Sequence, residues 1–386
     1  MIHYIGCDDR NINLFENQYP VPEGMSYNSY VIDDDKIVVL DTVDIRCAEQ
    51  WRENLAVALA GRKPDYLVVH HLEPDHSALA FELMQAYPEI KLVASQKAIQ
   101  MFTQFFPNAH LENRIHSVKE GDTLVLGTHC LHFMMAPMVH WPEVMVSYES
   151  TEKILFSADA FGKFGALSIC GKTDHEDTDW ACEARRYYFN ICGKYGTPVQ
   201  TLLRKVTALD VKHIYPLHGP QLSDTIPECV SLYDTWSRYA TEKSGVLVAV
   251  ASIHGGTETV AHYVAEQLEK RGVDMSFIDL CTTDVSYAVE DAFMFDRVIF
   301  AASSYDAGLF PPMHNLIHHL AIKSWQNKRV AIIENGSWAP SAGRVMREML
   351  STMKNIDIVE PMVTIHSRMN ETDMPNLDNL IVSLLN

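Results

Sequence analysis

The sequence has no run of apolar residues long enough to cross a membrane. Its longest apolar stretches, such as GVLVAVASI at 245–253, have the length of a β-strand, whereas a membrane helix needs about 20 apolar residues. The first residues, MIHYIGCDDRNINLF, lack the basic start and the long apolar core of a signal peptide. We therefore expect a cytoplasmic protein.

Paired cysteines and positive charge are also scarce. The eight cysteines are scattered without a C-x-x-C pair, which excludes a built-in rubredoxin or zinc ribbon of the usual spacing and indicates reduced thiols. Lysine and arginine number 31 against 50 aspartates and glutamates, and the formal net charge is −19. This balance argues against nucleic acid or an anionic membrane surface as a partner.

Two domains are expected, because 386 residues exceed what one hydrophobic core usually organises. The clearest boundary is RYATEKSGVLVAVAS, where we expect Gly245 to stop a polar helix before a new buried strand. We predict a first domain over 1–243 and a second domain over 246–386.

The two predicted domains differ in their patterns. The second has five apolar runs separated by helical segments, at 246–251, 275–280, 297–302, 329–334 and 356–363. This alternation predicts a doubly wound parallel sheet whose ligand lies at the carboxyl ends of the strands. The first domain contains two hairpin patterns, YNSYVIDDDKIVVLDTV and VMVSYESTEKILFSAD, mixed with helices. That mixture predicts a sandwich of sheets with helices outside.

Ionisable side chains crowd the segment HHLEPDH at 70–76, directly after the apolar run YLVV. In an extended chain His71, Glu73 and Asp75 share one face, and His76 follows at once. Such groups are costly to bury, and a metal ion removes that cost by supplying the opposite charge. A lone histidine is more often a hydrogen-bonded core residue, but four convergent donors predict a metal site.

Three further donors stand where strands are expected to end. They are His140 in MVHWPEVM, Asp159 in ILFSADAFG and His218 in HIYPLHGP. Junctions between strand and loop are the usual place for site residues on a rigid scaffold. The segment at 70–76 nearly saturates one ion by itself, so additional ligands indicate two ions.

HLEPDH followed by His140, Asp159 and His218 resembles the metallo-β-lactamase superfamily. The form H-x-E-x-D-H, in place of H-x-H-x-D-H, is similar to that of flavodiiron proteins, whose two domains come in the same order. The resemblance implies an N-terminal metallo-β-lactamase-like αββα sandwich followed by a flavodoxin-like sheet. It also implies a μ-oxo- or μ-hydroxo-bridged pair of irons, one held by His71, Glu73 and His140, the other by Asp75, His76 and His218, with Asp159 bridging them.

The second domain has loops suited to a flavin. Its first loop combines glycines, hydroxyls and a helix N-terminus, which together can hold a phosphate. No G-x-G-x-x-G fingerprint is present, so FMN is preferred to FAD or NAD. The residues expected at the FMN are Ser252, Ile253, His254, Gly255, Gly256 and Thr257 in the first loop, Ser303, Ser304, Tyr305, Asp306 and Gly308 in the second, and Asn335, Gly336, Ser337, Trp338 and Ala339 in the third. Tyr305 and Trp338 are candidates to stack on the flavin ring, with ordinary surface packing as the alternative.

The resemblance implies an oxidoreductase that reduces O2 to water, NO to N2O, or both. Electrons would pass through FMN from a donor protein such as rubredoxin, and the chain would act as a head-to-tail homodimer or a dimer of dimers. Tyr195 is a candidate hydrogen-bond donor beside the irons, with a purely structural role as the favoured alternative. Two alternatives stay open: a dinuclear zinc hydrolase with an attached flavodoxin domain, and a flavin electron-transfer protein with an inactive metal domain. Glu73 argues against zinc, because a carboxylate is a harder ligand than imidazole and favours iron.

Overall fold

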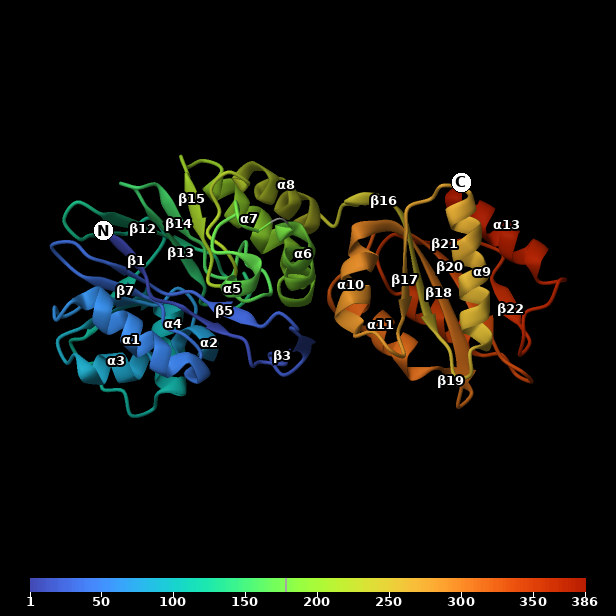
Figure 1. Cartoon of the computed structure of the whole chain (residues 1–386), viewed down its shortest axis with the longest axis horizontal. Helices are drawn as coiled ribbons and strands as arrows, with labels where there is room; N and C mark the ends of the chain where they lie inside the picture. Colours follow the sequence, from blue (N-terminus) through green and yellow to red (C-terminus); the bar gives the residue numbers. More distant parts are fainter. Residues whose placement is uncertain (178) are drawn as a thin grey trace. The chain divides into compact units, whose positions relative to one another are not determined.

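The computed structural model describes residues 1–177 and 179–386 (Figure 1). The chain forms two compact units, Met1–Tyr188 with Tyr195–Asp234, and Phe189–Lys194 with Thr235–Asn386. This division differs from the predicted domains, which assign all residues up to 243 to the first. Within the second unit the rings of Phe189 and Phe293 stack, with centroids 4.1 Å apart.

The first unit is built on two sheets. The six-stranded sheet has the order β1 (Ile2–Tyr4), β6 (Tyr30–Ile32), β7 (Val38–Leu40), β8 (Tyr66–Val68), β9 (Lys91–Ser95) and β10 (Ile115–Val118). The five-stranded sheet has the order β11 (Thr123–Val125), β12 (Cys130–Met135), β13 (Met145–Glu149), β14 (Ile154–Phe156) and β15 (His213–Tyr215). Two small ribbons pair β2 (Cys7–Asp9) with β5 (Met25–Tyr27) and β3 (Leu14–Phe15) with β4 (Tyr19–Pro20).

Alternating apolar side chains of these two sheets form one shared core. Its members include Val38, Leu40 and Val93 from the first sheet and Leu131 and Phe133 from the second. The predicted hairpins are present, because β6 pairs antiparallel with β7 and β13 pairs antiparallel with β14. The predicted sandwich is therefore confirmed.

Helices lie outside the sandwich (Figure 1). Those up to the end of the first domain are η1 (Ile45–Cys47), α1 (Ala48–Leu59), α2 (Pro74–Ser77), α3 (Ala80–Ala86), α4 (Gln96–Phe105), α5 (Leu167–Cys170), α6 (Trp180–Ile191), η2 (Gly193–Tyr195), α7 (Gly196–Val206) and α8 (Ile226–Ser237). Within the described residues, no helix has the length and apolar character needed to span a membrane.

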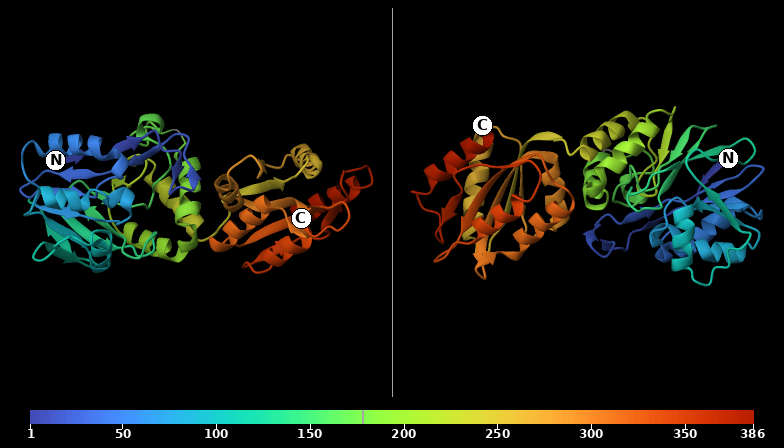
Figure 2. Two further views of the ribbon diagram at one scale, coloured as in Figure 1. Left: turned by 90° about the horizontal axis from the view of Figure 1, so that it is seen from below. Right: turned by 180° about the vertical axis from the view of Figure 1, so that it is seen from behind.

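The second unit contains the predicted parallel sheet. Its order is β17 (Met275–Asp279), β16 (Lys243–Ala251), β18 (Phe295–Tyr305), β20 (Lys328–Asn335) and β21 (Ile356–Ile358), with β19 (Gly308–Leu309) beside β18 and β22 (Val363–Ile365) beside β20. Its helices are α9 (Gly256–Lys270), α10 (Val285–Met294), α11 (Pro311–Ile322), α12 (Ala342–Leu350) and α13 (Met374–Leu385). They cover both faces of the sheet, as Figures 1 and 2 show. The flavodoxin-like expectation is confirmed.

Two local expectations were wrong. Gly245 does not stop a helix, because α8 already ends at Ser237 and Gly245 lies inside β16. A Cβ at Gly245 would stand 2.6 Å from the carbonyl oxygen of Asp274, so glycine is needed there for close approach of the backbones. The apolar run 356–363 is two strands rather than one, because Pro361 lacks the N–H that a continuous ladder needs.

Leu131 offers a test of the shared core. We expect Leu131→Ala to lower the free energy of unfolding of the first unit by about 2–5 kcal/mol, because the side chain is fully buried between the sheets and its removal leaves a cavity. Val125→Ala is the matched control, since Val125 is 64% exposed on the same sheet and should change stability by less than about 0.5 kcal/mol. Urea titration measures both, and equal midpoints for the two variants would contradict this account of the core.

Candidate metal centre and cofactor loops

The segment at 70–76 leaves the carboxyl end of β8 and turns into a short helix. Pro74 is the first residue of α2, the position where its fixed φ and missing N–H are tolerated. Asp75 and His76 therefore lie on a helical turn. Asp75 does not lie on the extended face that we expected it to share with His71 and Glu73. Proline is the reason that the alternation fails.

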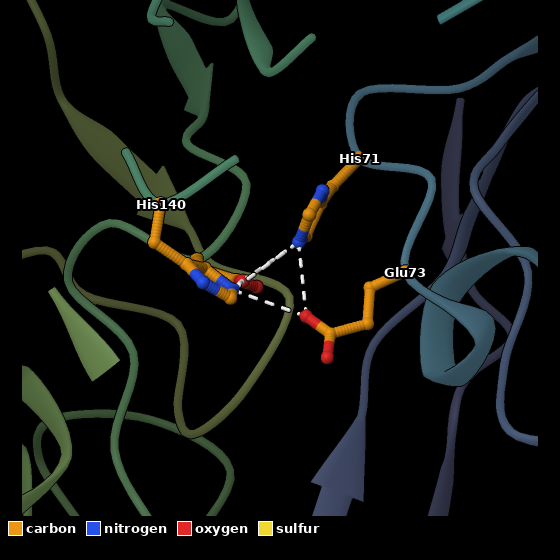
Figure 3. Close-up of side chains that lie close together, drawn as sticks. His71, Glu73 and His140 are labelled. Atoms are coloured by element: carbon orange, nitrogen blue, oxygen red, sulfur yellow. Dashed lines mark hydrogen bonds and ion pairs between the residues drawn. The ribbon is translucent and has the colours of Figure 1, made fainter. Parts of the chain in front are cut away.

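The seven predicted donors are brought together in two adjacent groups. His71, Glu73, His140 and Asp159 form one, and Asp75, His76 and His218 form the other, with the potential ligand atoms of each group within 4.8 Å of one another. Figure 3 shows His71 and Glu73, from one segment, and His140, from another, turned toward a common point. The structure thus assembles the whole predicted set, and its role as ligands remains a prediction.

Asp159 lies between the two groups. Its Oδ2 is 3.0 Å from His140 Nε2, and its Oδ1 is 3.2 Å from His76 Nε2. One carboxylate therefore presents one oxygen to each group. This is the arrangement that a bridging ligand requires.

The histidines point their Nε2 atoms at one another. His76 Nε2 and His218 Nε2 are 3.0 Å apart, and His71 Nε2 and His140 Nε2 are 3.3 Å apart. His218 Nδ1 lies 2.7 Å from the carbonyl oxygen of Ser26, which only accepts, so Nδ1 carries the proton and Nε2 keeps its lone pair. Lone pairs that converge in this way suit a shared cation.

Glu143 fixes His71 in the same manner. Its fully buried carboxylate accepts from His71 Nδ1 at 2.8 Å and from the backbone N–H of Leu72 at 3.0 Å. Neither Glu143 nor Ser26 was predicted. A glutamate among apolar residues in HWPEVM was the one available signal, and a backbone carbonyl leaves no signal in a sequence.

A second network holds the backbone of the donor segment. His70 Nδ1 donates to Asp41 Oδ2 at 2.6 Å, and His70 Nε2 accepts from the Ser147 hydroxyl at 2.7 Å. Thr42 donates its hydroxyl and its backbone N–H to the carbonyl of His76, at 2.9 and 2.7 Å. His70 thus serves as a hydrogen-bonded core histidine, and the donors beside it are anchored by the ends of neighbouring strands.

The electrostatics of the groups favour added positive charge. Burial alone would lower the pKa of His140, but hydrogen bonds with Asp159 and Glu73 raise it to about 9. Burial alone would raise the pKa of Asp159, but the charges of His71 and His76 and a hydrogen bond from His140 hold it well below its usual range. Both Asp75 oxygens and Asp159 Oδ1 are buried without a hydrogen-bond partner in the described part of the chain. Cations in the two groups would satisfy these oxygens, so the donor set fits metal ions.

Access to the groups is uneven. The side chain of Glu73 is 16% exposed, whereas His71, His76 and His218 are fully buried. Rings of Phe15, Tyr27 and Tyr187 stand 5.3, 5.6 and 5.6 Å from the ring of His218. A small molecule therefore reaches the donors most readily beside Glu73.

The residues expected to hold FMN lie on three loops of the second unit. These loops follow β16, β18 and β20, which are parallel neighbours, so their carboxyl ends share one edge of the sheet. Thr257 Oγ1 and Ser303 Oγ meet in a hydrogen bond of 2.8 Å. Ser252 Oγ is buried with no hydrogen-bond partner among the described residues, which leaves its O–H for a phosphate. These features fit FMN.

Two predicted residues instead stabilise the loops themselves. Ser304 Oγ accepts from the backbone N–H groups of Ser341 and Ala342 at 2.8 and 3.1 Å, where α12 begins. Asn335 uses both atoms of its side-chain amide on the backbone of Ser367.

The remaining residues of the set lie along the same edge. Trp338 is 92% exposed, and Tyr305 is 45% exposed with its ring 5.7 Å from that of Phe310. The others lie in the three loops or at the adjoining ends of α9, β18 and β19: Ile253, His254, Gly255, Gly256, Asp306, Gly308, Gly336, Ser337 and Ala339. Tyr195 stands apart from them, at the end of η2 in the first unit, and no hydrogen bond joins it to the metal-site donors within the described residues.

The sandwich and its paired donor groups define a β-lactamase-like metal-binding unit, here joined to a flavodoxin-like unit. Residues 25–219, which include all seven donors, match the family described as ODP family beta lactamase. The chain belongs to this family, and its whole-chain fold is that of the flavodiiron proteins. The resemblance found in the sequence is thereby confirmed.

Three similar proteins illustrate the match. The anaerobic nitric oxide reductase flavorubredoxin of Aeromonas hydrophila subsp. hydrophila is 26% identical over 92% of this chain and 73% of its own. The rubredoxin oxygen:oxidoreductase from the anaerobe Desulfovibrio gigas has a TM-score of 0.93 at 24% identity, covering 99% of this chain and 96% of that one. The flavodiiron protein from Giardia intestinalis has a TM-score of 0.93 at 23% identity, covering 99% and 94%.

Glu143 provides a test of how His71 is held. We expect Glu143→Gln to lower metal affinity about 10–100-fold, because the amide still accepts a hydrogen bond but lacks the charge that makes the imidazole a better ligand. Competition with a chromophoric chelator measures the affinity. Glu49→Gln, an exposed position on α1, is the control and should bind as the unmodified protein does. Unchanged affinity in Glu143→Gln would show that Glu143 has no part in metal binding.

Proposed function

We propose that this chain is a flavodiiron oxidoreductase that reduces O2 to water, NO to N2O, or both. Its site would be two irons held by the two donor groups, and electrons would arrive through FMN from a donor protein such as rubredoxin. The head-to-tail homodimer implied by the sequence resemblance is part of the same proposal.

One observation carries the proposal. Asp159 presents one oxygen to each of two groups of histidines and carboxylates, and Glu73 stands at a position where the superfamily usually has histidine. The additional anionic oxygen ligand favours iron over zinc. The flavodoxin-like unit in the same chain supports a redox reaction, since hydrolysis has no use for a flavin.

Residues around the two donor groups orient the histidines and limit the access of water. When bound, the irons and FMN would supply the electrons, four for O2 or two for a pair of NO molecules. Ser26 and Glu143 fix the tautomers of His218 and His71, so that Nε2 faces inward in each. The aromatic rings around His218 exclude water from that side, and the partly exposed Glu73 marks the side open to a small gas molecule.

Metal content tests the site directly. Protein produced with iron available should contain about two irons per chain, because both donor groups are complete. His218→Ala removes a donor from one group only and should lower the content toward one iron. His262→Ala, at an exposed position on α9, is the control and should retain two. Zinc alone, with gas-reducing activity retained, would refute the diiron assignment.

Gas turnover tests the reaction. After anaerobic reduction with dithionite, addition of O2 or NO should reoxidise the flavin rapidly while the gas is consumed. His140→Ala should slow this turnover by about 100-fold or more while leaving the flavin spectrum unchanged, because His140 lies in the other unit of the chain from the flavin loops. Stopped-flow absorbance and a gas electrode follow the two events. Absence of turnover in protein that contains both iron and flavin would defeat the proposal and leave the hydrolase or the electron-transfer alternative.

A further inference from the structure

A fourth loop lies at the edge of the second unit's sheet where the three loops expected to hold FMN meet. β22 runs parallel to β20, with Ile365 opposite Asn335. The turn that follows β22 consists of His366, Ser367 and Arg368 and therefore lies beside the loop that follows β20. It contains no glycine and comes after a strand of three residues, so nothing in its sequence marks it as part of a site.

This turn touches the start of α9. A Cβ built on Gly256 would stand 2.6 Å from the carbonyl oxygen of Ser367, closer than Cβ atoms come to other atoms in proteins. Glycine at 256 is therefore what permits the two segments to meet. Ser252 Oγ, buried and without a partner in the described part of the chain, belongs to the same loop as Gly256. The turn and the loop at 252–257 thus form adjoining walls.

The turn is held in an unusual conformation. Ser367 has φ of +70°, a region that residues with a side chain rarely adopt. Asn335 Nδ2 donates to the Ser367 carbonyl at 3.1 Å, and the Ser367 N–H donates to Asn335 Oδ1 at 3.0 Å. The Ser367 hydroxyl donates to Ser337 Oγ at 2.8 Å. Backbone conformations of this kind persist where the surroundings impose them, and they gather at ligand sites.

Charge distinguishes this turn from the other loops at the edge. Residues 246–386 contain 17 acidic and ten basic residues, so the unit as a whole repels an anion. Among the described residues, Arg368 is the sole lysine or arginine on the loops that follow the strands of the second unit at this edge. Its side chain is exposed and forms no ion pair with any described residue. Arg368 is therefore a free cation beside a loop suited to phosphate.

We propose that the turn at 366–368 is a fourth wall of the flavin site and that Arg368 binds the phosphate of FMN. The inference rests on the proposed function, since it takes FMN as the ligand of this unit. A planar guanidinium can pair with two phosphate oxygens at once, and it adds the positive charge that the loop at 252–257 does not supply.

Riboflavin, which lacks the phosphate, separates this role from others. Full-length protein stripped of flavin is titrated with FMN and, separately, with riboflavin, and quenching of flavin fluorescence reports binding. We expect Arg368→Gln to weaken FMN binding about tenfold and to leave riboflavin binding within about twofold. Arg368→Lys should restore part of the loss. Arg344→Gln is the control, because Arg344 is an exposed arginine near the start of α12 that already pairs with Glu348 at 2.9 Å, and it should change neither affinity.

Three other results of the titrations would contradict the inference or the proposed function. Equal FMN affinity in Arg368→Gln and the unmodified protein overturns the inference. An equal loss for FMN and riboflavin overturns it too, because the turn would then act on the ring or on the fold and not on the phosphate. Failure of the unmodified protein to bind FMN at all refutes the flavin half of the proposed function itself, and so differs from a failure confined to Arg368.

Discussion

The architecture of the first unit depends on burying ionisable groups that would otherwise prefer water. Four histidines and three carboxylates converge at the ends of strands, and most of them are almost wholly shielded from solvent. An unpaired buried charge costs several kcal/mol even after relaxation, so a site of this kind survives only if its groups neutralise one another and a cation. The raised pKa of His140 and the lowered pKa of Asp159 express this mutual dependence.

The groups that hydrogen-bond the metal-site histidines decide which ring nitrogen of each faces the site. Imidazole has two nitrogens, and the one that faces the centre is decided by what the other one binds. Here a backbone carbonyl accepts from Nδ1 of His218 and a buried carboxylate accepts from Nδ1 of His71, so that Nε2 of each ring faces the site. The supporting groups come from β5, which belongs to a small ribbon, and from the segment after His140, so parts of the chain outside the two large sheets orient the donors.

Much of this organisation could be predicted from the sequence, for physical reasons. Donors such as His140 and His218 could be predicted because they lie in the loops that follow strands, the usual place for site residues on a rigid scaffold. The alternation argument failed at Pro74, which begins a helix and turns Asp75 away from the face of His71 and Glu73. Glu143 and the Ser26 carbonyl could not be found, because their partners are distant in sequence and a carbonyl belongs to every residue. The turn around Ser367 escaped notice because its conformation is imposed by Asn335 and not by its own residues.

The hydrogen-bond chain through His70 has a mechanical consequence for the sandwich. Asp41 and His70 follow strands of the six-stranded sheet, whereas Ser147 lies on β13 of the five-stranded sheet. Hydrophobic burial between the sheets has no preferred direction, so it alone does not fix how the sheets are aligned. A buried hydrogen bond does, because displacement by one residue would leave the carboxylate, the imidazole and the hydroxyl without partners. His70 therefore links the two sheets by hydrogen bonds and fixes how they are aligned with each other.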